Sequence, residues 1–248
     1  IFDGETEELQ WKKDMDGNDN TDSLVYGMLA ADLNGNGIDE LIVAQQSKLS
    51  VFVDGDRDMQ ADETGINSGY GLAVADLFGS DRNELVVTDG SGNVYILGLS
   101  GTTLTTYQEW NSWQVMNTGA GVAISLTHEN PWIVHGGDAG ILVAWEVTSS
   151  SSHALAWDST SDNNGGSTLY SLPGGNTYGI GVGNIDSDPA LEILVGSGAR
   201  QVYAFDGITH ALDWVSPVLD ELPMGIQVAN LDDDSDNEIV ISTGNPGE

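Results

Sequence analysis

One stretch recurs along the chain and decides the fold: GMLAADLNGNGIDELIVA at residues 27–44. Three further copies are GLAVADLFGSDRNELVVT from residue 71, GIGVGNIDSDPALEILVG from residue 179 and GIQVANLDDDSDNEIVIS from residue 225. A fifth copy with a shorter loop, GAGVAISLTHENPWIVHG, begins at residue 119. Each copy places a polar loop between two short apolar runs. This pattern predicts two strands joined by a hairpin loop.

The spacing of the copies predicts the architecture. Successive copies begin 44, 48, 60 and 46 residues apart, which is the length of a four-stranded propeller blade. Every copy except the one from residue 225 is followed by a second pair of apolar runs, such as NVYILGLSGTTLTTYQEW at residues 93–110. We label the four strands of each unit A to D in chain order. The sequence therefore predicts an all-β fold, a β-propeller of four-stranded blades.

The two ends of the chain suggest how the ring closes. The chain opens with IFDGETEELQW, a C–D pair without its A–B pair, and closes with an A–B pair without its C–D pair. Pairing these halves would remove two free sheet edges and give five blades in one domain, residues 1–248. The expected blades are 27–66, 67–113, 117–158, 177–216, and 222–248 with 1–13. The alternative is an arc of a larger propeller.

Composition and charge narrow the range of partners. Lys and Arg total 6 against 39 Asp and Glu, a formal charge of −33, so we expect neither nucleic acid nor an anionic membrane surface as a partner. No apolar run approaches the roughly 18 residues of a membrane helix, and we expect no membrane insertion. The absence of cysteine excludes disulfides and thiolate metal sites. Cation sites, adaptation to high salt and solvation of loops all remain possible sources of the acidity.

The first polar loop has the ligand pattern of a hard cation. Asp32, Asn34 and Asn36 stand at loop positions 1, 3 and 5, Gly37 follows at position 6, and Glu40 stands at position 9. Oxygen ligands in this alternation suit calcium. An EF-hand would need Glu at position 12, where this chain has an apolar valine, so the loop is not an EF-hand.

The repeated D-x-N-x-N-G-x-x-E loop, followed by V-Y-x-x-D-G and a terminal Trp, resembles the FG-GAP/VCBS repeats of integrin-alpha-like β-propellers. The resemblance covers nearly the whole chain. It implies calcium binding in the A–B hairpin loops. It also implies an extracellular role in adhesion or recognition, in some proteins as a module attached to an enzyme.

About three calcium sites are expected, each from one A–B loop. In the first, the Ile38 carbonyl would join the four side chains named above. The predicted ligands are Asp32, Asn34, Asn36, Ile38 and Glu40; Asn184, Asp186, Asp188 and Glu192; and Asn230, Asp232, Asp234 and Glu238. In the copy from residue 71, Phe78 takes position 3 and Arg82 enters the loop, so we expect hydrogen bonds to hold it. The copy from residue 119 has no regular ligand spacing, and we expect it to bind no ion.

No residue pattern predicts catalysis. The four histidines share no ligand spacing, and no Ser, Cys or Lys stands in a nucleophile motif. The leading hypothesis is a non-catalytic, calcium-stabilised extracellular propeller, a recognition, adhesion or scaffold module that binds a protein or carbohydrate ligand on one face. Because the chain begins at Ile1 without a leader, we expect it to belong to a larger surface or secreted protein. The alternative is a carbohydrate-active enzyme domain, a polysaccharide lyase or glycosidase, which exposed aromatic residues beside a His or Lys would favour.

Overall fold

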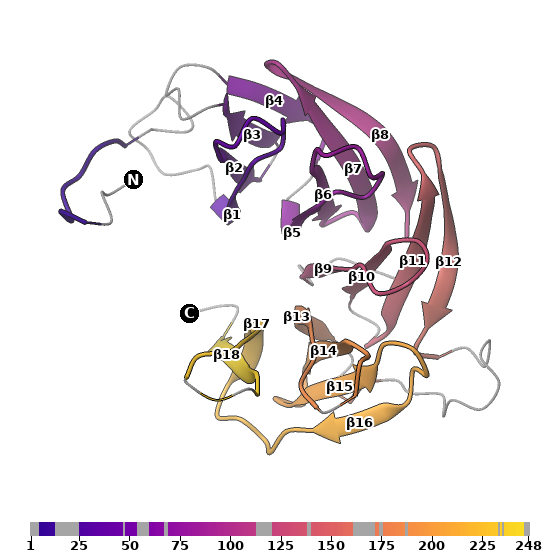
Figure 1. Cartoon of the computed structure of the whole chain (residues 1–248). Helices are drawn as coiled ribbons and strands as arrows, with labels where there is room; N and C mark the ends of the chain where they lie inside the picture. Colours follow the sequence, from indigo (N-terminus) through magenta and orange to yellow (C-terminus); the bar gives the residue numbers. More distant parts are fainter. Residues whose placement is uncertain are drawn as a thin grey trace.

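The computed structural model shows a β-propeller built from antiparallel sheets around a central axis (Figure 1). It describes residues 5–12, 25–46, 48–53, 60–66, 69–112, 121–137, 140–160, 172–173, 176–186, 188–232, 234 and 236–245. Four sheets have four strands each, in which every strand pairs with its neighbours in chain order. A fifth sheet has two strands. The described residues contain no helix long and apolar enough to cross a membrane.

The strands follow the predicted repeats. The first blade contains β1 (Val25–Ala31), β2 (Glu40–Gln45), β3 (Lys48–Phe52) and β4 (Gln60–Thr64). The second contains β5 (Gly69–Ala75), β6 (Glu84–Asp89), β7 (Asn93–Ser100) and β8 (Thr103–Asn111). The third contains β9 (Val122–Ser125), β10 (Trp132–Gly136), β11 (Leu142–Ser149) and β12 (Ser152–Asp158). The fourth contains β13 (Thr177–Gly183), β14 (Glu192–Ser197), β15 (Val202–Asp206) and β16 (Leu212–Val215), and the fifth sheet contains β17 (Leu222–Ala229) and β18 (Glu238–Gly244).

The A strands lie nearest the axis and the D strands lie outermost (Figure 1). Neighbouring A strands approach so closely that glycine is required at the contact. A Cβ atom on Gly179 of β13 would lie 2.7 Å from the Cα atom of Gly225 in β17. This explains why these repeat copies begin with glycine, because any side chain there would push the two inner strands apart.

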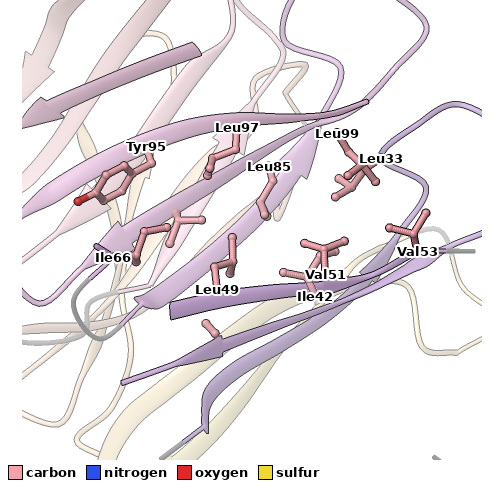
Figure 2. Close-up of a cluster of buried hydrophobic side chains, with 12 residues drawn as sticks. Leu33, Ile42, Leu49, Val51, Val53, Ile66, Leu85, Tyr95, Leu97 and Leu99 are labelled. Atoms are coloured by element: carbon pink, nitrogen blue, oxygen red, sulfur yellow. The ribbon is translucent and has the colours of Figure 1, made fainter. Parts of the chain in front are cut away.

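Each seam between neighbouring sheets holds its own hydrophobic cluster. In the first seam, Leu49 and Val51 of β3 face Leu85 of β6 and Leu97 of β7, as Figure 2 shows. Similar clusters fill the seams between the second and third blades, the third and fourth blades, and the fourth blade and β17–β18. The B strands β6, β10 and β14 are buried along their whole length, since their side chains face a neighbouring blade on both sides.

Closure of the ring by the N-terminal segment stays a prediction. In Figure 1 the arc is open between β1 and β17–β18, and residues 5–12 lie on that side. Residues 5–12 contain no strand, and within the described part of the chain no strand pairs with the outer edge of β18. The Trp11 ring does pack edge-on against Phe52 of the first blade, with ring centroids 5.3 Å apart.

Candidate cation sites in the A–B loops

The position-9 glutamate closes each of the four acidic A–B loops. In every one, its Oε2 atom accepts a hydrogen bond from the backbone N–H of the second loop residue. The N–H groups of Leu33, Leu77, Ile185 and Leu231 donate to Glu40, Glu84, Glu192 and Glu238 over 2.8, 2.8, 2.7 and 2.7 Å. Three of these glutamates are buried, and Glu238 is half-buried. The recurrence of this residue thus has a structural cause in addition to the predicted ligand role.

The first loop folds around the carboxylate of Asp32. Its Oδ1 atom accepts hydrogen bonds from the N–H groups of Gly35 (2.7 Å) and Asn36 (3.2 Å), and its Oδ2 atom accepts one from Gly37 (2.7 Å). These bonds, above all that from Gly37, lower the pKa of Asp32 despite the opposing effect of desolvation. Gly35 and Gly37 have φ angles of 80° and 83°, which side chains disfavour.

The other predicted ligands of the first loop lie in the same small network. The Asn34 Oδ1 atom accepts from the Asn36 N–H (3.1 Å), and the Asn36 Oδ1 atom accepts from the Ile38 N–H (2.8 Å). Asn34 donates its Nδ2–H to the Oε1 atom of Glu40 over 2.9 Å. The structure therefore brings the predicted side chains of this loop together, with two carboxylates and two amides.

The second loop is held by hydrogen bonds, as the sequence predicts. Asp76 accepts from the N–H groups of Ser80 (3.0 Å) and Asp81 (3.1 Å). The ring of Phe78 packs edge-on against Tyr107 of β8, with centroids 5.7 Å apart. Asn83 reaches the preceding loop and donates its Nδ2–H to the Asp32 carbonyl over 2.7 Å.

The acids of the fourth-blade A–B loop lie close to two further carboxylates from the C–D half of the same blade. Asp186 accepts from the Asp188 N–H (2.8 Å), Asp188 accepts from the Ala190 N–H (2.7 Å), and Asn184 donates to the Asp188 carbonyl (2.6 Å). Two sets of three acids each offer oxygen atoms within 4.8 Å of one another, and both contain Glu192: Asp186, Glu192 and Asp213, and Asp188, Glu192 and Asp206.

Sequence reasoning missed Asp206 and Asp213. Asp206 ends β15, and Asp213 lies in β16, so neither belongs to an A–B loop. The signal that could have found them is topological. In an antiparallel A-B-C-D sheet, the A–B and C–D turns lie at the same end, so acids beside the C–D turn approach the A–B loop.

The last loop brings its three predicted acids together. Asp232, Asp234 and Glu238 offer oxygen atoms within 4.8 Å of one another. Asn230 donates its Nδ2–H to the Asp234 carbonyl (2.6 Å), and Asp232 accepts from the Asp234 N–H (2.9 Å). Asn237 donates to the Asn184 carbonyl over 2.8 Å, which ties this loop to that of the fourth blade.

The third blade replaces the glutamate with an aromatic residue. Trp132 pairs with Ser125 across the hairpin, as Glu40 pairs with Ala31 in the first blade. The loop between them covers residues 126–131, two fewer than residues 32–39 of the first blade, so the predicted shortening is confirmed. His128 in this loop stacks on Trp132 with ring centroids 3.6 Å apart.

Two of the described tryptophans of the D strands pack between blades. Trp110 contacts Trp145 of the third blade (5.7 Å between centroids), and Trp157 contacts Phe205 of the fourth (5.9 Å). Both Trp110 and Trp157 are buried. Trp214, at 38% exposure, is the more open one, and Trp113 lies outside the described residues.

The A strands line an open cavity of about 570 Å³ at the axis. Apolar side chains, including Leu29, Val74 and Val182, line it, and Asp32 and Asp39 belong to the same lining. The cavity places the first-loop carboxylates at the inner side of the propeller. Among the described residues, neither histidine nor lysine lines this cavity.

Comparison with known proteins places the chain by fold alone. A scan of the sequence against protein-family models finds no match, and a search of curated proteins finds none either. Among solved structures, the chain is similar to BBS1N, crystallised in complex with ARL6DN and soaked with lead or mercury. The TM-scores are 0.59 and 0.61 at 10% and 11% identity, over 90% of this chain and 64% of the BBS1N chains. At this identity the likeness shows a shared β-propeller fold.

Proposed function

We propose that this β-propeller is a non-catalytic, calcium-stabilised recognition, adhesion or scaffold module of a larger extracellular protein. The observation that carries the proposal is the position of its acids. In the fourth blade and the last sheet, carboxylates gather around a glutamate at the same end of successive sheets. Such oxygen-rich groups suit calcium, which neutralises their mutual repulsion.

The proposal assigns stabilisation to the cations and recognition to a propeller face. Each loop joins strands A and B of one sheet, so a bound ion would hold the inner hairpin in place. A protein ligand is the partner we favour, and BBS1N, a propeller of similar fold, was crystallised in complex with ARL6DN. A carbohydrate-active enzyme would expose aromatic rings to its substrate. Three tryptophans, Trp110, Trp132 and Trp157, are instead buried between blades.

Calcium counting tests the proposal. Because Glu238 also accepts the Leu231 N–H, its replacement would disturb the loop itself. Asp232→Asn is the cleaner change, since it keeps the shape of the side chain. We expect calorimetry to find about three ions with dissociation constants of about 10⁻⁴ to 10⁻³ M, as in extracellular modules, and one fewer in Asp232→Asn. The matched control, Asp220→Asn, lies in an exposed segment outside the acid groups and should bind the wild-type number.

Thermal unfolding provides the second measurement. We expect calcium to raise the melting temperature and a chelator to lower it at constant ionic strength, because only the folded chain presents the assembled ligands. Unchanged melting with no calcium bound would contradict the proposal. Release of reducing ends or unsaturated sugars from a polysaccharide panel would replace it with the enzyme alternative.

A further inference from the structure

A buried carboxylate oxygen without a hydrogen-bond partner marks a site that extends from the fourth-blade A–B loop to strand D. Glu192 is fully buried at the start of β14, and its Oε1 atom has no hydrogen-bond partner. Asp186 and Asp213 offer oxygen atoms that lie with one from Glu192 within 4.8 Å of one another. All three residues line a cavity of about 540 Å³ between the fourth blade and β18. A buried, unsatisfied carboxylate oxygen is costly, so a ligand that satisfies it would stabilise the fold.

A β-bulge accounts for the position of Asp213. The register between β15 and β16 pairs Ala204 with Trp214 and Phe205 with Leu212, so Asp213 is the extra residue. Bulges re-aim a side chain at the point where they occur. The C–D turn also contacts the A–B loop directly, since the Gly207 N–H donates to the Leu191 carbonyl over 3.1 Å. The bulge and the turn together bring the strand-D carboxylate to the A–B loop.

The second blade has the same bulge and fills the same place with apolar rings. Its register pairs Ile96 with Gln108 and Leu97 with Thr106, so Tyr107 is the extra residue. Tyr107 packs against Phe78, which stands at loop position 3. The fourth blade has Asp213 and Asp186 at these two positions. An aromatic contact that needs no ligand is thus replaced by two like charges beside a buried third.

In the described part of the chain, no Lys or Arg is among the groups that shift the pKa of Glu192 or Asp213. Burial and the neighbouring carboxylates of Asp186 and Asp188 raise the pKa of Glu192. Burial and three neighbouring aspartates, Asp206 first, raise the pKa of Asp213. The last Lys or Arg in the sequence is Arg200, and its Nη1–H donates to the backbone carbonyl of Asp220. Like charges gathered at this distance repel one another, so they favour a bound cation.

We propose that Glu192, Asp186 and Asp213 bind a divalent cation at the seam between the fourth blade and β17–β18. Asp213 supplies a ligand from strand D, which the A–B loop pattern does not contain. The ion would tie the outermost strand of the blade to its A–B loop and hold the position that Phe78 and Tyr107 hold in the second blade. The inference rests on the proposed function in taking the ion to be calcium.

Calcium titration of the full chain tests this site directly. We expect Asp213→Asn to lower the affinity for one calcium ion on the order of tenfold or more, because it removes one of three charged ligands. Asp220→Asn removes the same charge from an exposed segment of the chain and should leave every affinity unchanged. If Asp213→Asn binds calcium like the wild type, the inference is wrong while the loop sites of the proposed function stand. If the wild type binds no calcium, both fail.

Terbium luminescence locates the ion. Trp214 lines the same cavity and follows Asp213 in the chain, so it should sensitise Tb³⁺ bound there. We expect Trp214→Phe to lose most of this emission at an unchanged number of bound calcium ions, and Asp213→Asn to lose it by losing the ion. Undiminished emission from Trp214→Phe would place the ion elsewhere.

A double variant separates metal loss from misfolding. Asp186→Phe with Asp213→Tyr copies the aromatic pair of the second blade. We expect it to bind one calcium ion fewer and to melt, in chelator, at or above the temperature of the wild type in chelator. Retention of all wild-type calcium ions by this variant would overturn the inference.

Discussion

The third blade differs from the other repeats at the first residue of strand B, which is an aromatic residue instead of a glutamate. In the other repeats a buried or half-buried carboxylate at this position accepts a hydrogen bond from a loop N–H: Glu40, Glu84, Glu192 and Glu238. The third blade has Trp132 at this position. Around it four rings follow one another: His128, Trp132, His210 and Trp157. The centroid distances are 3.6, 5.4 and 4.8 Å, with interplanar angles of 9°, 20° and 14°.

The ring stack joins two blades, whereas each glutamate serves mainly its own hairpin. His210 comes from the C–D turn of the fourth blade and lies between Trp132 and Trp157 of the third. Stacked aromatic pairs are each worth about 0.5–1.5 kcal/mol beyond the area that they bury. In the third blade, a stack of rings that joins two blades thus takes the place that an acidic loop around a glutamate has in the other repeats.

The largest effect is expected from breaking the stack. Trp132→Ala removes a buried ring between two histidines and should lower the free energy of unfolding by about 3–5 kcal/mol. Urea denaturation followed by circular dichroism measures the loss. Trp132→Phe keeps a ring in the stack and should lose less, so equal losses in the two variants would contradict the stacking argument.

A smaller loss of stability is expected from removing the buried carboxylate of the second blade. Glu84→Ala leaves the buried Leu77 N–H without its acceptor and should cost about 1–3 kcal/mol. Because we expect no ion in that loop, the loss in urea midpoint should be the same with calcium and with a chelator. A loss that appears only with calcium would show that Glu84 is a metal ligand.

A pH dependence is the last expected effect, and it belongs to the third blade. His135 is fully buried in β10, at the place of Val43 in the first blade, and accepts the indole N–H of Trp145 over 3.0 Å. Burial lowers the pKa of His135 to about 4 from 6.5. The unfolded chain therefore binds this proton first, so stability present above pH 6.5 is lost as the pH falls towards 4.

The expected slope is about 1.4 kcal/mol per pH unit within that window. His135→Gln keeps an acceptor for the indole but does not titrate, and its stability should fall less between pH 6.5 and 5 than that of the wild type. Chemical denaturation at several pH values measures both slopes. Parallel curves for the two proteins would show that His135 does not carry the dependence.

The N-terminal segment contacts the first blade at a position where the third blade contacts the fourth. Leu41 pairs with Phe52 in the first blade as Ile193 pairs with Phe205 in the fourth, so the two phenylalanines are equivalent. Trp157 packs on Phe205 from the preceding blade with its ring tilted, and Trp11 packs edge-on against Phe52. This equivalence favours the predicted role of the N-terminal segment as the outer part of a fifth blade.

The sequence by itself determined the repeat, the strands and the position of the acidic loops. Hydrophobic runs around each polar loop predict the A and B strands, and the spacing of the copies predicts four-stranded blades. These features are local, because strand pattern and turn chemistry depend on residues close together in the chain. The acids Asp232, Asp234 and Glu238 belong to this class, since one short loop brings them together.

Only the tertiary structure decided what each acid does. The buried hydrogen bond of Glu40 to the Leu33 N–H depends on how the loop folds back over its own hairpin. The approach of Asp213 to Glu192 depends on a bulge in β16 and on the shared end of the A–B and C–D turns. The insertion of His210 between two tryptophans depends on how two blades pack. Strand register and blade packing join residues far apart in the chain, and no local pattern in the sequence specifies such pairs.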